Sequence, residues 1–143
     1  MLSSTVCAFI GTICFSLLFN VPKKYYLYCG VVGALGWMCY CLVDPYATAE
    51  FATFLATLVV VLSSRICAVW RKCPITIFLV SGIFPLVPGA SVYNTAYHFI
   101  TNDLAEATTW GISALKVAFA IVLGIVFIVP IPREMFTKKY WDL

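Results

Sequence analysis

Long runs of apolar residues alternate with short polar or charged breaks along the sequence. An α-helix needs about 20 mainly apolar residues, within a range of about 17–25, to cross the hydrocarbon layer of a membrane. Five stretches are close to that length, at residues 2–19, 25–43, 47–64, 74–101 and 109–129. The breaks between them contain turn-forming residues or charges, such as Asp44-Pro45, where the residue before proline avoids helical geometry. The pattern predicts an all-α, polytopic membrane helical bundle of about five transmembrane helices, in one transmembrane domain over residues 1–143.

The composition excludes several other classes of protein. Of the 143 residues, 63% are hydrophobic and 10% are charged. A soluble domain typically has about 45–50% apolar and about 25% charged residues. So few charges do not cover the surface of a soluble domain, and such high hydrophobicity excludes a disordered chain. The formal net charge of +3 is too small for the dense basic face that nucleic-acid binding needs.

The basic residues predict the orientation of the helices. They fall in every second connection and in the C-terminal tail, which the positive-inside rule places in the cytoplasm. The N-terminus is then outside and the C-terminus cytoplasmic. We expect the first helix to be retained, because no basic segment precedes it and no clear signal-peptide cleavage site follows it. Eight of the nine basic residues follow this pattern, namely Lys23 and Lys24 in the first connection, Arg65, Arg71 and Lys72 in the third, and Arg133, Lys138 and Lys139 in the tail. The ninth, Lys116, lies inside the last apolar run.

A proline- and glycine-rich break interrupts the fourth apolar run at Pro85–Gly89. Each proline lacks an N–H group and clashes with the carbonyl four residues earlier. At 1.5 Å per residue, Pro85 lies about 18 Å beyond the start of the run, somewhat past the middle of the membrane. Free backbone groups at that depth must be buried in protein or line a wet cavity, and transporters bind substrates at such breaks. The pattern therefore predicts a substrate-binding site, and the alternative is a proline kink near the outer end of an ordinary helix. The predicted site residues are Pro85, Pro88, Gly89, Ser91, Tyr93 and Asn94.

Ionisable residues near the outer side are further candidates for function. Lys116 is the clear charge inside a membrane run, and intramembrane charges are functional candidates by default. It either contacts a substrate carboxylate, or it snorkels to the interface or pairs with Asp103 or Glu106. His98 has the intrinsic pKa of a proton carrier, about 6.5. We regard His98, Asp103 and Glu106 as candidates for proton coupling, with an exposed interfacial role as the alternative.

The remaining chemistry points away from an enzyme. No combination of nucleophile, base and orienting residue stands out, and no glycine-rich phosphate-binding loop is present. Seven cysteines lie mostly inside apolar runs, which favours buried, reduced thiols over disulfides. One histidine and a Cys39-x-Cys41 pair do not make a convincing four-ligand zinc site. We expect no metal, no cofactor and no enzymatic activity.

Small residues recur at helical spacing and predict close helix packing. Gly30, Gly33 and Gly36 are three residues apart, and Ala120 and Gly124 are four apart. Small residues let helix backbones approach closely in lipid, where no hydrophobic force drives helices together. The packing is either within this chain or against a second subunit, which includes the possibility of a homo-oligomer.

Three segments together resemble a known family. They are Phe19-Asn20-Val21-Pro22 after the first helix, the glycine-rich second helix, and Phe84-Pro85-Leu86-Val87-Pro88-Gly89-Ala90-Ser91-Val92-Tyr93. The chain resembles the C-terminal membrane half of the threonine/serine exporter (ThrE-type) family, which many bacteria encode separately as a small subunit. The resemblance implies proton-driven export of small amino acids across the cell inner membrane. It also implies a larger partner subunit that supplies the other membrane half.

The expected function is therefore a membrane subunit of a secondary exporter for threonine and serine. Export of small organic acids, dicarboxylic acids in particular, is an alternative. A non-transporting accessory or assembly protein is another alternative, although it would not need a broken helix at membrane depth. A self-assembling channel is disfavoured because no helix carries the regular polar stripe that lines a pore.

Overall fold

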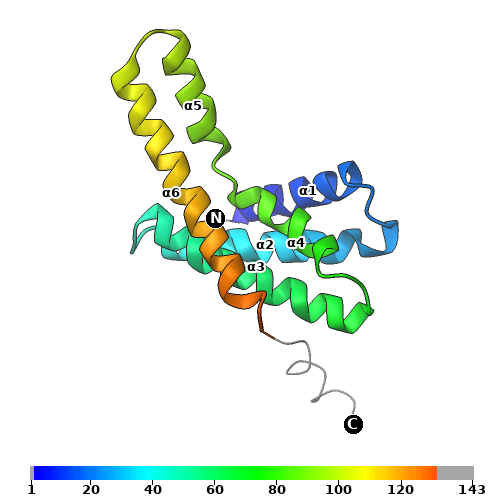
Figure 1. Cartoon of the computed structure of the whole chain (residues 1–143). Coiled ribbons are helices and arrows are strands. Elements are labelled where there is room, and N and C mark those ends of the chain that lie inside the picture. Colours follow the sequence, from blue (N-terminus) through cyan, green and yellow to red (C-terminus); the bar gives the residue numbers. More distant parts are fainter. Residues whose placement is uncertain (1, 132–143) are drawn as a thin grey trace.

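The structure is a computed structural model, and it describes residues 2–131. These residues form helices joined by short turns, with no strand among them (Figure 1). The basic residues Arg133, Lys138 and Lys139 of the tail lie outside the described residues. The helices are α1 (Leu2–Leu18), the 3-10 turn η1 (Lys23–Tyr25), α2 (Tyr26–Val43), α3 (Ala49–Arg71), α4 (Thr76–Ile83), the 3-10 turn η2 (Phe84–Leu86), α5 (Gly89–Ile100) and α6 (Leu104–Ile128).

Two predicted helix boundaries are wrong, and charged residues explain both. The third helix continues to Arg71 instead of ending at residue 64, because Arg65 is accommodated inside it by hydrogen bonds to the end of α6. The last helix begins at Leu104 instead of residue 109. There the Asp103 side chain accepts a hydrogen bond from the Glu106 backbone N–H at 3.3 Å and caps the helix.

Helices α1 to α4 form a bundle in which glycines allow close approach. A Cβ atom on Gly33 would lie 2.1 Å from Thr12 Oγ1 of α1, and one on Gly36 would lie 2.3 Å from Val60 Cγ2 of α3. These two positions leave no room for a side chain. The glycine spacing in α2 is therefore used for packing within this chain, on α1 at one position and on α3 at the other.

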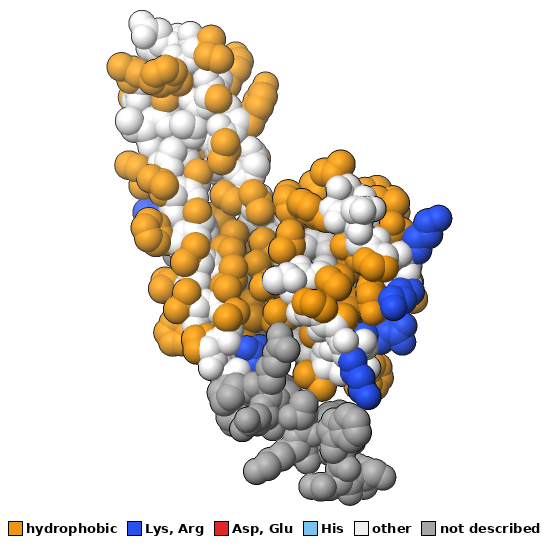
Figure 2. All heavy atoms as spheres, turned by 45° about the vertical axis from the view of Figure 1, so that its right-hand side comes forward, with side chains coloured by type: hydrophobic (Ala, Val, Ile, Leu, Met, Phe, Trp, Pro, Cys, Tyr) orange, Lys and Arg blue, Asp and Glu red, His pale blue; other side chains and the backbone are white. Residues whose placement is uncertain are grey.

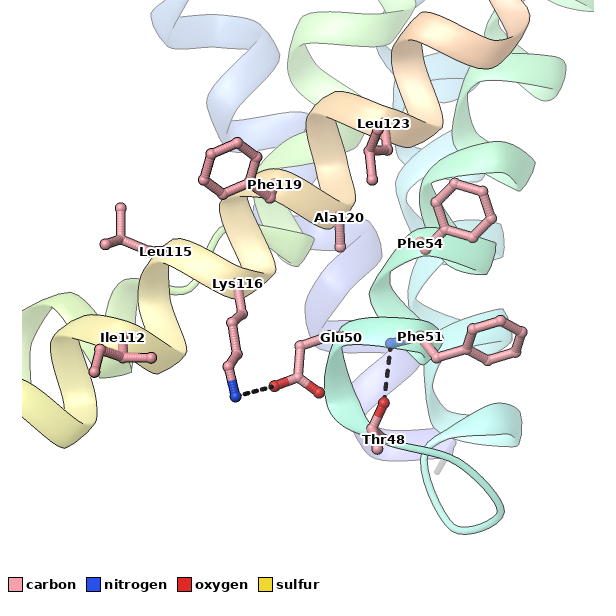
Figure 3. Close-up of a pocket in the computed structure, with 10 residues that line it drawn as sticks. All are labelled: Thr48, Glu50, Phe51, Phe54, Ile112, Leu115, Lys116, Phe119, Ala120 and Leu123. Carbon is pink, nitrogen blue, oxygen red and sulfur yellow. Dashed lines mark hydrogen bonds and ion pairs between the residues drawn. The ribbon is translucent and has the colours of Figure 1, made fainter.

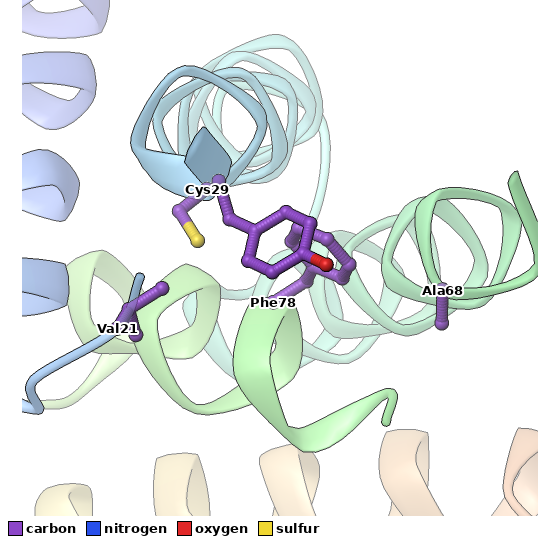
Figure 4. Packing of buried hydrophobic residues seen from close by; sticks show 5 residues of the cluster. Val21, Cys29, Ala68 and Phe78 are labelled. Carbon is purple, nitrogen blue, oxygen red and sulfur yellow. The ribbon is translucent and has the colours of Figure 1, made fainter. Parts of the chain in front are cut away.

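The centre of the bundle is apolar, with hydroxyl groups that bond within their own helices. One core cluster consists of Val21, Tyr25, Cys29, Ala68 and Phe78 (Figure 4). Thr12, Ser16 and Ser81 are fully buried. Each donates to the carbonyl four residues earlier, at 2.7–2.8 Å. Such bonds satisfy the hydroxyl without a partner on another helix, so these residues act here as small packing residues.

Helix α6 runs parallel to α3 and packs closely against it. A Cβ atom on Gly124 would lie 2.8 Å from Thr57, and the rings of Phe54 and Phe127 are 6.0 Å apart. Further along, the α3 side chain of Arg65 bonds to carbonyls that follow α6. The Glu50–Lys116, Thr57–Gly124 and Arg65–Val129 contacts advance in the same order along both helices, so α3 and α6 run in the same direction.

The predicted break between α4 and α5 is present. Thr76–Leu86 and Gly89–Ile100 are bent by 52° at the break, where Val87 is extended and Pro88 caps α5. Helix α5 leaves the bundle and packs on the first half of α6, so the two form a projecting hairpin (Figure 1). No residue of α5 is buried.

Several of the described helices are long enough to span a membrane. Three are long and apolar enough to cross a bilayer, over Lys23–Val43, Ala49–Arg71 and Leu104–Ile128, and the bent pair would make a fourth span. Helix α1 has 17 residues, at the lower limit for crossing. Apolar side chains cover much of the surface in Figure 2, as a lipid environment requires. The polytopic helical fold is confirmed, whereas five crossings and the orientation of the termini stay predictions.

Candidate functional site

A pocket of about 610 Å³ lies between the N-terminus of α3 and the middle of α6. This volume is within the usual range of about 300–1,000 Å³ for small-molecule sites. Figure 3 shows phenylalanine and leucine side chains around one oppositely charged pair. The lining residues are Thr48, Glu50, Phe51, Phe54, Ile112, Leu115, Lys116, Phe119, Ala120 and Leu123.

The start of α3 holds the acidic side of the pocket. Thr48 has extended backbone geometry, and its side-chain oxygen accepts a hydrogen bond from the Phe51 N–H at 3.4 Å. A threonine in this position satisfies one of the free N–H groups at a helix N-terminus. Glu50 follows in the first turn, where the positive end of the helix dipole favours a carboxylate. The local sequence therefore places a stabilised negative charge at the pocket.

Lys116 supplies the basic side of the pocket from α6. Its Nζ lies 4.0 Å from Glu50 Oε1, and the lysine side chain is 62% exposed against 34% for the glutamate. The alternative of an ion pair with Asp103 or Glu106 is wrong, because these residues lie ten or more positions before Lys116 and Glu50 is the partner that lies within 4.0 Å. At 1.5 Å per residue, ten residues span about 15 Å. Parallel packing of α6 on α3 brings Glu50 closer to Lys116 than Asp103 or Glu106.

The residues of the helix break lie outside this pocket. Pro85 is in η2, Pro88 is the residue before α5, and Gly89 is its first residue. A Cβ atom on Gly89 would meet no atom within 4 Å, so no close packing requires glycine there. On α5, Ser91 and Asn94 are half-buried and Tyr93 is 68% exposed.

The register of the α5–α6 hairpin explains why the break and Lys116 are apart. Gly111 of α6 faces Thr95 of α5. A Cβ atom on Gly111 would lie 3.4 Å from Thr95 Cγ2. Because the two helices are antiparallel, Lys116 lies at the height where α5 begins. Five residues at 3.6 residues per turn also rotate Lys116 about 140° away from Gly111. Lys116 therefore faces α3, on nearly the opposite side of α6 from α5.

The three candidates for proton coupling lie near the turn that joins α5 to α6. His98 Nδ1 lies 4.0 Å from Asp103 Oδ2, and Asp103 bonds to the backbone of Glu106. The side chains are 26% and 50% exposed for His98 and Asp103. His98 and Asp103 are thus brought together. They are separated from the Glu50–Lys116 pair, because Lys116 lies 13 residues beyond Asp103 along α6.

Arg65 is a buried charge that sequence reasoning assigned to a connection. It is 9% exposed in the middle of the second half of α3. Its two terminal nitrogens donate to the carbonyl oxygens of Val129 and Ile131, just after α6. Carbonyls that follow the end of a helix have no partner within the helix, and the Arg65 guanidinium satisfies two of those that follow α6. A signal was present, since Thr57, Val61 and Arg65 are four residues apart and share one face.

We expect Arg65→Met to loosen the end of α6 and to destabilise the protein by about 3 kcal/mol. A hydrogen bond to a charged group contributes roughly 1.5–3 kcal/mol, and this substitution removes two. Thermal unfolding in detergent measures the loss, and hydrogen exchange locates it at residues 120–131. Arg65→Lys keeps the charge and should retain about half of the stability. Unchanged exchange at the end of α6 in Arg65→Met would contradict this role.

The comparisons agree with the resemblance in the sequence. The family model described as "Threonine/Serine exporter, ThrE" matches residues 4–131, which is nearly the whole chain and every helix described above. No solved structure matches the chain significantly. The apolar helices, the bent pair and this match all indicate a component of a membrane transport system. The chain belongs to the threonine/serine exporter family.

Proposed function

We propose that this chain is a non-enzymatic subunit of a proton-coupled secondary exporter of threonine-type small amino acids. It would act in the cell inner membrane with a larger subunit of the same family. The observation that carries the proposal is the Glu50–Lys116 pair at the mouth of an otherwise apolar pocket. A free amino acid has one ammonium and one carboxylate group, and this pair offers one partner of each sign.

The pair also favours an amino acid over a dicarboxylate. In the proposed complex, Lys116 binds the substrate carboxylate and Glu50 binds the substrate ammonium group. The two charges are 4.0 Å apart, a loose pair that a zwitterion can separate by replacing each partner with its own charge. A dicarboxylate would place its second negative charge near Glu50, and that like-charge contact is unfavourable. The apolar lining suits a short side chain.

The exposed hairpin supports a partner subunit. Helix α5 has no buried residue, and Tyr93, Tyr97 and Phe99 are more than half exposed. The pocket is lined by residues at the start of α3 and in α6, and it is open to the surface. A second membrane half would cover both, and inverted halves around a midplane site are common in secondary transporters.

The break between α4 and α5 fits a hinge for alternating access. Only Val87 and Pro88 separate the two rigid segments, and hinges are short segments that absorb a change in backbone angles. In this proposal the hairpin moves relative to the bundle. Ser91, Tyr93 and Asn94 then approach the substrate, and His98, Asp103 or Glu106 carries the proton from the outer side.

The test is efflux of preloaded threonine, serine and a dicarboxylate from cells. Cells that express this chain alone are compared with cells that also express the candidate large subunit. We expect threonine and serine efflux only with both chains, and its loss when the proton gradient is collapsed. Dicarboxylate efflux in place of amino acids would overturn the substrate assignment, and efflux from the single chain would overturn the need for a partner.

We expect Pro85→Ala with Pro88→Ala to reduce threonine efflux by about tenfold or more. Proline in a helix interior costs about 3 kcal/mol, so removing both favours a continuous helix over the 52° bend. Initial efflux rates measure the effect, and co-purification with the large subunit controls for assembly. Normal efflux from an assembled double variant would favour the accessory-protein alternative.

A further inference from the structure

Basic residues from two distant segments meet at one end of the bundle. Lys23 and Lys24 belong to η1, and Arg71 and Lys72 end α3. Figure 2 shows Lys and Arg side chains gathered along one edge of the bundle. Two of them share an aromatic ring. Lys24 Nζ lies 4.8 Å from the ring centroid of Tyr25, and the Arg71 guanidinium carbon lies 5.8 Å from the same centroid.

The aromatic rings beneath these cations are held firmly in the core. Tyr25 is 6% exposed, and Phe78 of α4 is fully buried. The Phe78 ring lies 5.6 Å from that of Tyr25 and 6.4 Å from that of Tyr28, edge to face in both pairs. Arg71 also lies 5.0 Å from the Tyr28 centroid. Lys24 and Arg71 therefore contact rings that the core holds in place.

Among residues 2–131, no acidic side chain forms an ion pair with Lys24 or Arg71. Within residues 2–131, the ion pairs within 4.0 Å are His98–Asp103 and Lys116–Glu50, and neither is at this end. Two positive charges near one ring repel each other. A planar guanidinium group together with an ammonium group suits the binding of a phosphate group. Two cations held near the same aromatic ring therefore favour an anionic partner.

Apolar side chains beside the cations indicate which anion would bind. Ile66 and Trp70 are four residues apart on α3, and they are 53% and 68% exposed. Leu27, on the first turn of α2, is 65% exposed. A soluble phosphate gains nothing from these side chains, whereas the acyl chains of a phospholipid would cover them. Tryptophan is also enriched at the level of lipid headgroups.

We propose that η1 and the end of α3 form a binding site for an anionic phospholipid. Lys24 and Arg71 hold its phosphate, Lys23 and Lys72 add positive charge, and Ile66 and Trp70 contact its acyl chains. The lipid links the α1–α2 corner to the α3–α4 corner. The site is independent of the transported substrate, because it lies at the opposite end of α3 from Glu50.

The test uses the full chain in phosphatidylcholine nanodiscs, with or without phosphatidylglycerol. Native mass spectrometry measures retained lipid, and thermal unfolding measures stability. We expect preferential retention of phosphatidylglycerol and a higher Tm in its presence. Lys24→Gln with Arg71→Gln should reduce the preference by about 30-fold, since each basic residue near an anionic surface contributes roughly fivefold. Arg71→Lys keeps the charge but not the planar group, and it should lose less of the preference for phosphatidylglycerol. This conservative variant keeps the test valid if the double variant does not fold.

The matched control is Lys138→Gln with Lys139→Gln, which removes the same charge elsewhere in the chain. This control should retain the preference for phosphatidylglycerol. An equal loss in both double variants would mean a general charge effect and would overturn the proposal. Inorganic phosphate in neutral nanodiscs is the second comparison. If phosphate alone raises Tm as much as the lipid does, the site binds a free anion and the lipid assignment is wrong.

Discussion

Lys116→Gln is expected to lower threonine efflux by about tenfold to a hundredfold at equal abundance in the membrane. The lysine is placed to bind the substrate carboxylate, and it lies 4.0 Å from Glu50 across the pocket mouth. A hydrogen bond to a charged group contributes roughly 1.5–3 kcal/mol, and each 1.4 kcal/mol corresponds to about tenfold. Initial rates of efflux from preloaded cells measure the loss.

Lys138→Gln is the matched control for Lys116→Gln. It makes the same chemical change in the C-terminal tail, at a residue that is assigned to neither proposed site. We expect at most a small change in efflux from this control. Wild-type efflux from Lys116→Gln would remove Lys116 from the substrate site and would leave the pair with Glu50 as a surface ion pair, worth about 0–1 kcal/mol.

Glu50→Gln separates substrate binding from a purely structural ion pair. If Glu50 binds the ammonium group, its loss should reduce threonine efflux and reduce discrimination against lactate, a monocarboxylate that has a hydroxyl but no ammonium group. Binding sites that leave a charged group unpaired reject analogues strongly. The ratio of threonine to lactate efflux is the readout. A structural ion pair predicts that both rates fall together, with no change in the ratio.

Gly33→Val is expected to be the most damaging single change in the bundle. A Cβ atom at this position would lie 2.1 Å from Thr12 Oγ1 and 2.9 Å from both Thr12 Cβ and Cγ2. No rotation of the threonine side chain relieves all three contacts, so α1 must move away from α2. Overpacking costs about 1–3 kcal/mol and occasionally more. At the upper end, Tm should fall by roughly 10 °C.

Two further variants isolate the cause of that loss. Gly11→Val on α1 is the matched control, because a Cβ atom there meets no atom within 4 Å. Its free energy of unfolding should stay within about 0.5 kcal/mol of wild type, as for most substitutions that touch nothing. Adding Thr12→Gly to Gly33→Val should recover more than half of the lost stability, because residues in contact are coupled. Equal damage from Gly11→Val would refute close packing as the reason.

Helix formation and the break at residues 87–88 were predictable because both depend on neighbours in the chain. Runs of apolar residues predict membrane helices wherever they reach sufficient length. Proline removes a donor and clashes within its own helix, so no distant contact is needed to interrupt the fourth run. The helix ends at Arg71 and Leu104 were missed, since each depends on how a charge is accommodated.

The candidate site was predictable only in part. Lys116 stood out because a charge inside an apolar run must find partners. Its partner Glu50 could not be predicted, because Glu50 and Lys116 are 66 positions apart in the sequence and meet only through the register of α3 on α6. The same register rotates Lys116 away from the break, and so it separates residues that sequence reasoning combined into one site.

The sequence by itself therefore determined the all-helical membrane class, the interruption of the fourth run and the membership in the exporter family. These follow from composition, local backbone chemistry and an ordered motif. Only the tertiary structure decided that Arg65 is buried against the end of α6, that Glu50 faces Lys116, and that Lys24 and Arg71 share one tyrosine ring. Each of these depends on side chains from two helices meeting, and helix packing places such pairs without regard to their distance along the chain.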